Sequence, residues 1–217
     1  MVPASILRRV FMIKIGSDFG TAFTIELKGL QYLVTAKHVL SNIKNDLAVE
    51  VNHENSWQQL QIERIWYATA PRDLAILFLK ERISPQFDNT VMDEPYLSQD
   101  VYFLGFPYGQ TINVKKLNSG FPIPYVKKGI ISGYGDDESQ PDIIILDAIN
   151  NKGFSGGPVI SIGANNIPNI FGVINSFQFT PEFVFNGDQQ TILTTHANTG
   201  LTHCTSLKSA IDHLNAI

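Results

Sequence analysis

Short apolar runs separated by turn residues follow one another along almost all of the 217 residues. The runs have the length of strands and are bounded by Gly, Pro, Asn or Asp, and only the end of the chain shows a helical period. This pattern predicts an all-β barrel or sandwich. The runs are ILRRVFMIKI, TAFTIEL, YLVTAKHVL, LAVEV, WQQLQIERIWYA and DLAILFL in the first half, then VYFLGF, VKKGIISGYG, DIIILDAI, PVISIG and NIFGVINSF in the second.

Four segments lack such runs. Residues 84–95 carry two prolines and three acids with little periodicity, which indicates a linker between the two halves. Residues 108–124, 135–142 and 178–199 are predicted to be loops, and the last is long enough to have a function of its own or to be mobile.

The C-terminal segment is the one place with a clear helical period. Leu207, Ala210, Ile211 and Leu214 follow the i, i+3, i+4, i+7 spacing of one helix face. We therefore expect a helix over residues 205–216, with Thr205 or Ser206 as its cap.

The charge and hydropathy of the chain disfavour some classes of binding partner. The net charge is −4 and the 16 Lys and Arg residues form no basic stripe, which argues against nucleic acid or an anionic membrane as a partner. Lys127 and Lys128 are expected to be solvated loop charges. No run approaches the roughly 18 to 20 apolar residues that span a bilayer, and the first residues look like a mature N-terminus rather than a leader.

Cys204 is the single cysteine, so no internal disulfide can form. This favours a reducing compartment, and we expect a cytoplasmic protein. The surroundings of Cys204 are typical of a packed structural thiol.

The motif NKGFSGGPVI at residues 151–160 carries the candidate chemistry. Its glycines let backbone amides approach another group closely, and a reacting carbonyl is the group that such amides serve. Ser155 would then be a nucleophile, with the amides of Gly153 and Ser155 as an oxyanion hole. The alternative is a glycine-rich hairpin with an exposed serine.

A serine hydroxyl needs a base and an acid that orients the base. His38 ends the apolar run YLVTAKHVL and Asp73 opens the run DLAILFL, so both stand at the ends of predicted buried strands. Asp46 competes with Asp73 because it is closer to His38 in sequence. Asp73 has a second interpretation, as a turn residue or a partner of Arg72.

Together these motifs resemble the trypsin-like serine proteases, and most closely their HtrA-like branch. The resemblance rests, in the family's order, on GTAFTI, TAKHVL, DLAILFL, FLGFPYG, GIISG, DAINNKGFSGGPVI and FGVIN. It implies two six-stranded β-barrels of the chymotrypsin fold and a C-terminal helix, in one peptidase domain over residues 1–217. The expected parts are barrel 1 at 5–83, the linker at 84–95, barrel 2 at 96–204 and the helix, with the active site between the barrels.

The resemblance also implies a substrate cleft, for which the candidates are Ile149, Asn150, Ile174, Asn175 and Ser176. None is charged, so we expect cleavage after an uncharged or apolar residue. Relatives often have Asp or Asn before the nucleophile where this chain has Phe154. We therefore expect segments 108–124 and 178–199 to orient the oxyanion amides. We also expect a regulatory protein partner that orders these two segments.

The predicted function is a serine endopeptidase that acts on protein or peptide substrates through an acyl-enzyme. No metal or organic cofactor is expected, because His and Asp are scattered without metal-ligand spacing. Two alternatives stay open: a catalytically silent module of the same fold that binds peptides, and an esterase that uses the same serine.

Overall fold

The computed structural model describes residues 1–43, 49–53, 56–86, 95–112, 121–135, 139–140, 142–163 and 167–217. Within these residues the chain forms two β-sheets and a C-terminal helix, so the expected all-β double-barrel architecture is confirmed. No helix in the described residues is long and apolar enough to cross a membrane.

The first sheet has seven antiparallel strands in the order β5-β4-β1-β2-β3-β7-β6. The six expected strands become seven because the apolar run at 57–68 is divided at Leu60 and Gln61. Its first part pairs with β4 and its second part with β7. The strands are β1 Val10–Ile15, β2 Asp18–Leu27, β3 Leu30–Thr35, β4 Glu50–His53, β5 Ser56–Gln59, β6 Ile62–Tyr67 and β7 Ala75–Leu79.

The second sheet closes into the expected six-stranded barrel, in the order β10-β13-β12-β11-β8-β9. Its interior is built from alternate residues of each strand, and Cys204 is fully buried there, as predicted. The strands are β8 Asp100–Gly105, β9 Tyr125–Tyr134, β10 Ile143–Asp147, β11 Pro158–Ile162, β12 Pro168–Asn186 and β13 Gln189–Ser206.

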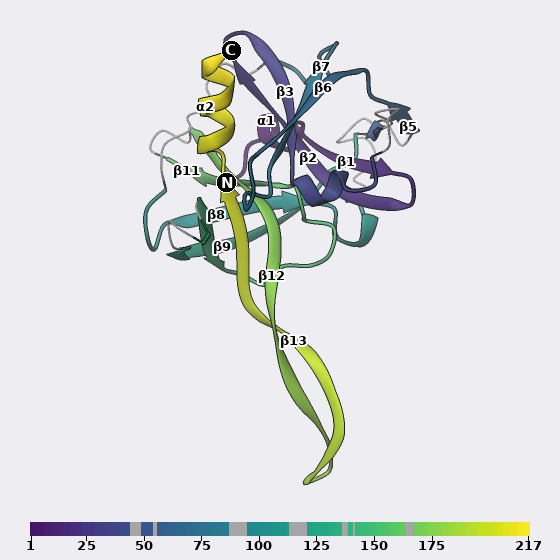
Figure 1. The fold of residues 1–217 in the computed structure, drawn as a ribbon, viewed down its shortest axis with the longest axis vertical. Helices are drawn as coiled ribbons and strands as arrows, with labels where there is room; N and C mark the ends of the chain where they lie inside the picture. The colour runs from purple at the N-terminus through teal and green to yellow at the C-terminus, as the bar shows by residue number, and fades with distance from the viewer. Residues whose placement is uncertain are drawn as a thin grey trace.

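The prediction of a loop at residues 178–199 is wrong. Strands β12 and β13 continue past the barrel as a two-stranded ribbon that ends in a turn at Gly187 and Asp188. Figure 1 shows this ribbon projecting well away from the rest of the molecule. The ribbon forms because Phe179, Phe183 and Phe185 fall on alternating positions, which is a strand pattern.

In the part of the chain that the structure describes, the sheets are accompanied by four short helical segments: α1 Ala4–Leu7, α2 Lys208–Ala216 and the 3₁₀ turns η1 Lys37–Leu40 and η2 Pro107–Gly109. The predicted C-terminal helix is present but begins at Lys208, because β13 continues to Ser206 and Leu207, not Thr205 or Ser206, is the N-cap residue. The Lys208 amide donates to the Ser206 hydroxyl at 3.2 Å. His213 of α2 stacks on Trp66 of β6 with ring centroids 4.5 Å apart. The last helix of the chain therefore packs against the first sheet.

One apolar cluster joins the two halves. It contains Phe23 and Ile76 from the first sheet, Leu104 and Val173 from the second, and Leu214 from α2, all buried. Because this shared core is close-packed, it fixes the two sheets relative to each other. The groups that face each other across their boundary are held in place by the same core.

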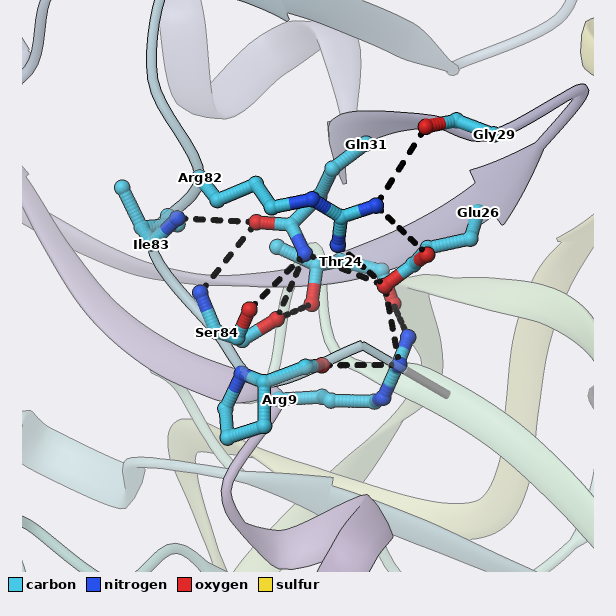
Figure 2. Close-up of polar contacts among 9 residues, drawn as sticks. Arg9, Thr24, Glu26, Gly29, Gln31, Arg82, Ile83 and Ser84 are labelled. Atoms are coloured by element: carbon cyan, nitrogen blue, oxygen red, sulfur yellow. Dashed lines mark hydrogen bonds and ion pairs between the residues drawn. The ribbon is translucent and has the colours of Figure 1, made fainter. Parts of the chain in front are cut away.

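A polar network attaches the start of the linker to the first sheet (Figure 2). Gln31 accepts from the Ile83 amide at 2.8 Å and donates to the Ser84 carbonyl at 3.1 Å. Arg9, almost fully buried, contacts Glu26 at 3.2 Å and donates to the Pro85 carbonyl at 3.1 Å. Residues 84–86 of the predicted linker are thus tied down, and residues 87–94 lie outside the described residues.

Glu26 is the acceptor at the centre of this network. Burial alone would raise the pKa of Glu26, but hydrogen bonds from Arg82 and Gln31 and the charges of Arg82 and Arg9 outweigh it. The pKa of Glu26 is therefore lowered below its ordinary 4.5. Arg82 contacts both carboxylate oxygens, at 2.8 and 3.0 Å, which is the bidentate geometry of a strong ion pair.

Candidate functional site

Ser155 lies in the tight turn between β10 and β11, on the second barrel. Gly153 has φ +104°, and a Cβ at that position would come within 2.3 Å of the Phe106 carbonyl oxygen. Only glycine fits this backbone. The next residue, Phe154, is fully buried and packs edge-on against Phe103, so it anchors the turn in the barrel core.

His38 and Asp73 come from the first sheet, His38 in η1 after β3 and Asp73 just before β7. The imidazole Nδ1 lies 2.6 Å from Asp73 Oδ2, and the His38 amide donates to Asp73 Oδ1 at 2.8 Å. Both carboxylate oxygens are thus bonded to one residue. The His38 side chain is 48% exposed, so its other ring nitrogen can be reached by a ligand.

The environment favours the ionised form of Asp73. Burial acts to raise the pKa of Asp73, but the hydrogen bonds and charge of His38 and a hydrogen bond from Asn175 outweigh it, so the pKa lies below its ordinary 3.8. Arg72 pairs instead with Asp142, at 2.5 Å between Nε and Oδ2. This excludes the interpretation of Asp73 as a partner of Arg72. The competing acid, Asp46, lies outside the described residues.

Ser155 and His38 face one cavity of about 440 Å³ between the two halves. In this arrangement the Ser155 hydroxyl donates to the Asn175 carbonyl at 3.0 Å, and no hydrogen bond joins it to His38. A rotation about χ1 of a serine moves its hydroxyl between staggered positions at little energetic cost. In this structure the Ser155 hydroxyl is thus directed to the Asn175 carbonyl and makes no hydrogen bond with the imidazole.

Asn175 connects the acid to the second barrel. Its side-chain amide donates to the Asp73 carbonyl at 2.7 Å and to Asp73 Oδ2 at 3.2 Å, while its Oδ1 accepts from the Thr205 hydroxyl at 2.8 Å. All of these polar atoms are satisfied in a residue that is 5% exposed. The described contacts of Asn175 are thus those of a group that orients Asp73, a role that the sequence did not indicate.

Thr21, on β2, holds the serine turn from the first sheet. Its hydroxyl donates to the Gly153 carbonyl at 2.7 Å and accepts from the Phe106 amide at 3.2 Å, and its own amide donates to the Ser155 carbonyl at 2.9 Å. Thr21 is fully buried. One residue of the first sheet therefore holds the backbone on both sides of Phe154, the Gly153 side through its hydroxyl and the Ser155 side through its backbone amide.

The amides of Gly153 and Ser155 donate to no acceptor among the described residues. The Lys152 carbonyl accepts from the Tyr108 amide at 2.9 Å. In a trans peptide the C=O and N–H point in opposite directions, so this bond turns the Gly153 N–H away from Tyr108. The two free amides belong to residues that line the same cavity as His38.

The contacts that orient these amides come mainly from Thr21 and from Tyr108, the first residue of the segment 108–124. Residues 113–120 of that segment lie outside the described residues. The segment 178–199 reaches the serine loop through Asn198, whose side chain donates to the Asn150 carbonyl at 2.8 Å. The expected part of segment 178–199 in orienting the amides is thus limited to this contact.

The expected cleft residues separate into two groups. Ile149, at 61% exposure, and Ser176 present their side chains to solvent, whereas Asn150 and Ile174 are buried. Ile174 also uses its amide and carbonyl in bonds to Gly157 and Gly156, so neither its side chain nor its backbone is available to a ligand. The structure therefore removes Ile174 from the cleft and makes Asn150 a residue that shapes the loop.

Lys127 corrects another expectation. It lies on β9, half-buried, and its Nζ donates to the Ile149 carbonyl at 2.6 Å and to Asn151 Oδ1 at 2.5 Å. Burial lowers the pKa of Lys127 below its ordinary 10.5. Lys127 is therefore not a solvated loop charge, because its ammonium group holds the loop before Ser155 by these two hydrogen bonds.

Sequence reasoning missed Thr21, Tyr108 and Lys127 as residues of the site. Thr21 and Tyr108 stand in two of the motifs that carry the resemblance, GTAFTI and FLGFPYG, so the motifs pointed to the right segments. Tyr108 adopts φ +53°, a left-handed conformation that is uncommon for tyrosine, next to Gly109. No local pattern marks Thr21 or Lys127, because their partners are far away in sequence.

The family model of the trypsin-like peptidase domain matches residues 20–166, about two thirds of the chain. The chain therefore belongs to the trypsin-like peptidases, which are serine protease hydrolases, and the resemblance seen in the sequence is confirmed. No curated protein matches the sequence significantly.

Solved structures of proteases share the fold at low sequence identity. The active form of the Rv3671c protease from M. tuberculosis is 19% identical with a TM-score of 0.63, over 98% of this chain and 82% of that chain. The HtrA-type protease AlgW with a tripeptide is 19% identical with a TM-score of 0.60, over 99% and 61%. The MamO protease domain from Magnetospirillum magneticum is 13% identical with a TM-score of 0.60, over 96% and 97%.

Proposed function

We propose that this protein is a serine endopeptidase in which Ser155 attacks the substrate carbonyl and forms an acyl-enzyme. His38 accepts the Ser155 proton and later donates it to the leaving amine, and Asp73 holds the imidazole tautomer and stabilises the imidazolium. The amides of Gly153 and Ser155 bind the oxyanion. The two halves act as one peptidase domain, since each contributes part of this set.

The observation that carries the proposal is the hydrogen-bonded pair of His38 and Asp73. His38 lines the same cavity as Ser155, and there the amides of Gly153 and Ser155 have no acceptor among the described residues. A histidine oriented by an ionised carboxylate is what a weak hydroxyl nucleophile requires. The carboxylate is held in its ionised form, as the lowered pKa of Asp73 indicates.

The proposed cleft contains the exposed residues Ile149 and Ser176 beside Asn175, whose side chain is bonded to Asp73. Because Ile149 is uncharged and Lys127 is engaged with the backbone, we expect cleavage after an uncharged or apolar residue. The tripeptide in AlgW supports a protein or peptide substrate for this chain too. We also propose that the protein is located in the cytoplasm, because its cysteine Cys204 is a buried, free thiol. A regulatory protein partner that orders the loops around the site is a further part of the proposal.

Labelling with a fluorophosphonate tests the proposal, because the reagent reacts with a serine only when base and oxyanion hole are both in place. We expect one adduct on Ser155 in the purified protein, and none in Ser155→Ala. Hydrolysis of a peptide library by the labelled and unlabelled protein is the second measurement. An adduct on another serine, or peptide hydrolysis that survives full labelling, would refute the mechanism.

Two alternatives remain, and the same experiment separates them. The Ser155 hydroxyl donates to the Asn175 carbonyl, which is the observation that favours a silent peptide-binding module. Such a module would bind peptides without labelling or turnover. An esterase would label and hydrolyse activated esters while it left peptides intact.

A further inference from the structure

The ribbon at residues 178–199, called the arm below, contacts the serine loop at its base, where Asn198 donates to the Asn150 carbonyl. Within the described residues its two strands pair only with each other, from Phe179 with Asn198 to Asn186 with Gln189. Figure 1 shows it standing clear of the body along its length. An isolated two-stranded ribbon is at best marginally stable in water, so the arm needs a surface to pack against.

One face of the arm is aromatic. Phe179, Phe183 and Phe185 are two or four residues apart on β12 and therefore lie on the same face, where they are 53%, 59% and 59% exposed. Their paired neighbours on β13 are uncharged at this face apart from the titratable His196. Ile192, wholly exposed, and Leu193 stand in the bulge opposite Val184.

The charges of the arm restrict what can cover this face. Residues 176–200 contain no Lys or Arg, and their two acids are Glu182, on the opposite face, and Asp188, in the turn. Binding to an anionic membrane or to nucleic acid relies on Lys and Arg, so both are disfavoured. A face without formal charge is complementary to itself, which an interface between two identical chains requires.

The exposed area suits an interface at the small end of the known range. A phenylalanine presents about 200 Å², so each half-exposed ring offers roughly 100 Å², and the three rings with one of the adjacent residues Ile192 and Leu193 give the aromatic face roughly 400 to 450 Å² of apolar surface. That lies within the range of the largest patch on a typical monomer. Two arms together would bury roughly 800 to 900 Å², the size of a weak interface that forms as the concentration rises.

We propose that the arm is a dimerisation element: the aromatic faces of two arms pack on each other about a two-fold axis. The occupant of the face is thus a second copy of this chain. The inference does not depend on the proposed function, because no arm residue belongs to the proposed catalytic set.

Sedimentation of the full chain tests the proposal. We expect the wild type to form a dimer whose fraction rises with concentration. Phe183→Ser combined with Phe185→Ser should weaken dimerisation at least about a hundredfold, as central aromatic residues dominate interfaces. Val184→Ser, a change of similar polarity on the opposite face, is the matched control and should leave the dimer intact.

Cross-linking keeps the test informative if the double variant does not fold. The native Cys204 is fully buried, so an introduced cysteine is the reactive one. Thr194→Cys lies on the aromatic face opposite Phe183, and Thr195→Cys lies on the other face opposite Glu182. With a flexible bismaleimide we expect dimers from Thr194→Cys and few from Thr195→Cys.

Several results would overturn the proposal. They are a wild type that stays monomeric at its highest soluble concentration, a dimer that survives the double substitution, or equal cross-linking from both faces. A monomeric wild type that binds lipid vesicles through the arm would assign the face to a membrane. If the wild type is monomeric and the double variant loses turnover of long polypeptides but not of short peptides, the aromatic face would be assigned to substrate binding.

Discussion

Thr21→Val should separate the geometry of the serine turn from the stability of the fold. Valine has nearly the shape of threonine but lacks the hydroxyl, which donates to the Gly153 carbonyl at 2.7 Å and accepts from the Phe106 amide at 3.2 Å. An unsatisfied buried polar group costs about 1 to 3 kcal/mol. With two such groups, we expect the free energy of unfolding to fall by about 2 to 6 kcal/mol.

The effect on catalysis follows from the same contact. Loss of one oxyanion donor lowers kcat by roughly 10² to 10³ in serine proteases. Thr21→Val leaves the Gly153 amide present but releases the carbonyl of the same residue, so a smaller loss of about 10- to 100-fold in kcat/KM is expected. The fluorophosphonate rate should fall in parallel, because that reaction uses the same two amides.

Thr24→Val is the matched control. Thr24 lies three residues further along β2, is equally buried, and bonds to the Ser84 hydroxyl at 2.7 Å, far from the serine turn. It should lose stability but keep kcat/KM, and Thr21→Ser should restore both. If Thr24→Val loses as much activity as Thr21→Val at a temperature where both are folded, the positioning role of Thr21 is refuted.

Three further predictions concern the site and its surroundings. Asp73→Asn should lower kcat by roughly 10⁴ through the wrong imidazole tautomer, as measured on a peptide substrate with circular dichroism to check folding; a loss below tenfold would contradict it. Gly153→Ala should reduce both folding yield and activity, because its Cβ would collide with the Phe106 carbonyl, and a wild-type melting temperature would refute that. Because the pKa of Glu26 is lowered by folding, its carboxylate stabilises the protein above about pH 4.5 and loses this effect as pH falls through the folded-state value; urea midpoints of Glu26→Gln and wild type should differ most near pH 7 and converge in acid, and a constant gap would argue against the linkage.

The sequence predicted the parts of the site that depend on local motifs. His38, Asp73 and Ser155 each stand at the end of a buried strand or in a glycine turn, so their own neighbours mark them. Asn175 and Ile174 show where this reasoning fails. Adjacent residues of a strand face opposite sides. A one-residue error in register therefore confuses Asn175, which contacts Asp73, with Ile174, which lies in the core.

The arm shows a different failure. Pro181, Gly187 and Asp188 are turn and breaker residues, and they favoured a loop. The alternation of Phe179, Phe183 and Phe185 was the competing signal, and pairing with β13 decided the outcome. The motif GTAFTI marks the segment of Thr21 but not its contacts, because hydrogen bonds to partners 85 and 132 positions away leave no periodicity in one sequence.

The division of the proposed catalytic set between two sheets has a consequence during synthesis. His38 and Asp73 leave the ribosome long before Ser155, and Asn175, which orients Asp73, comes later still. The second barrel closes only when β13 pairs with both β10 and β12. A growing chain therefore holds a histidine and an acid without a nucleophile while residues 74–154 are made, over a third of its length. The cell meets an assembled protease only after the strand that ends at Ser206 has been made.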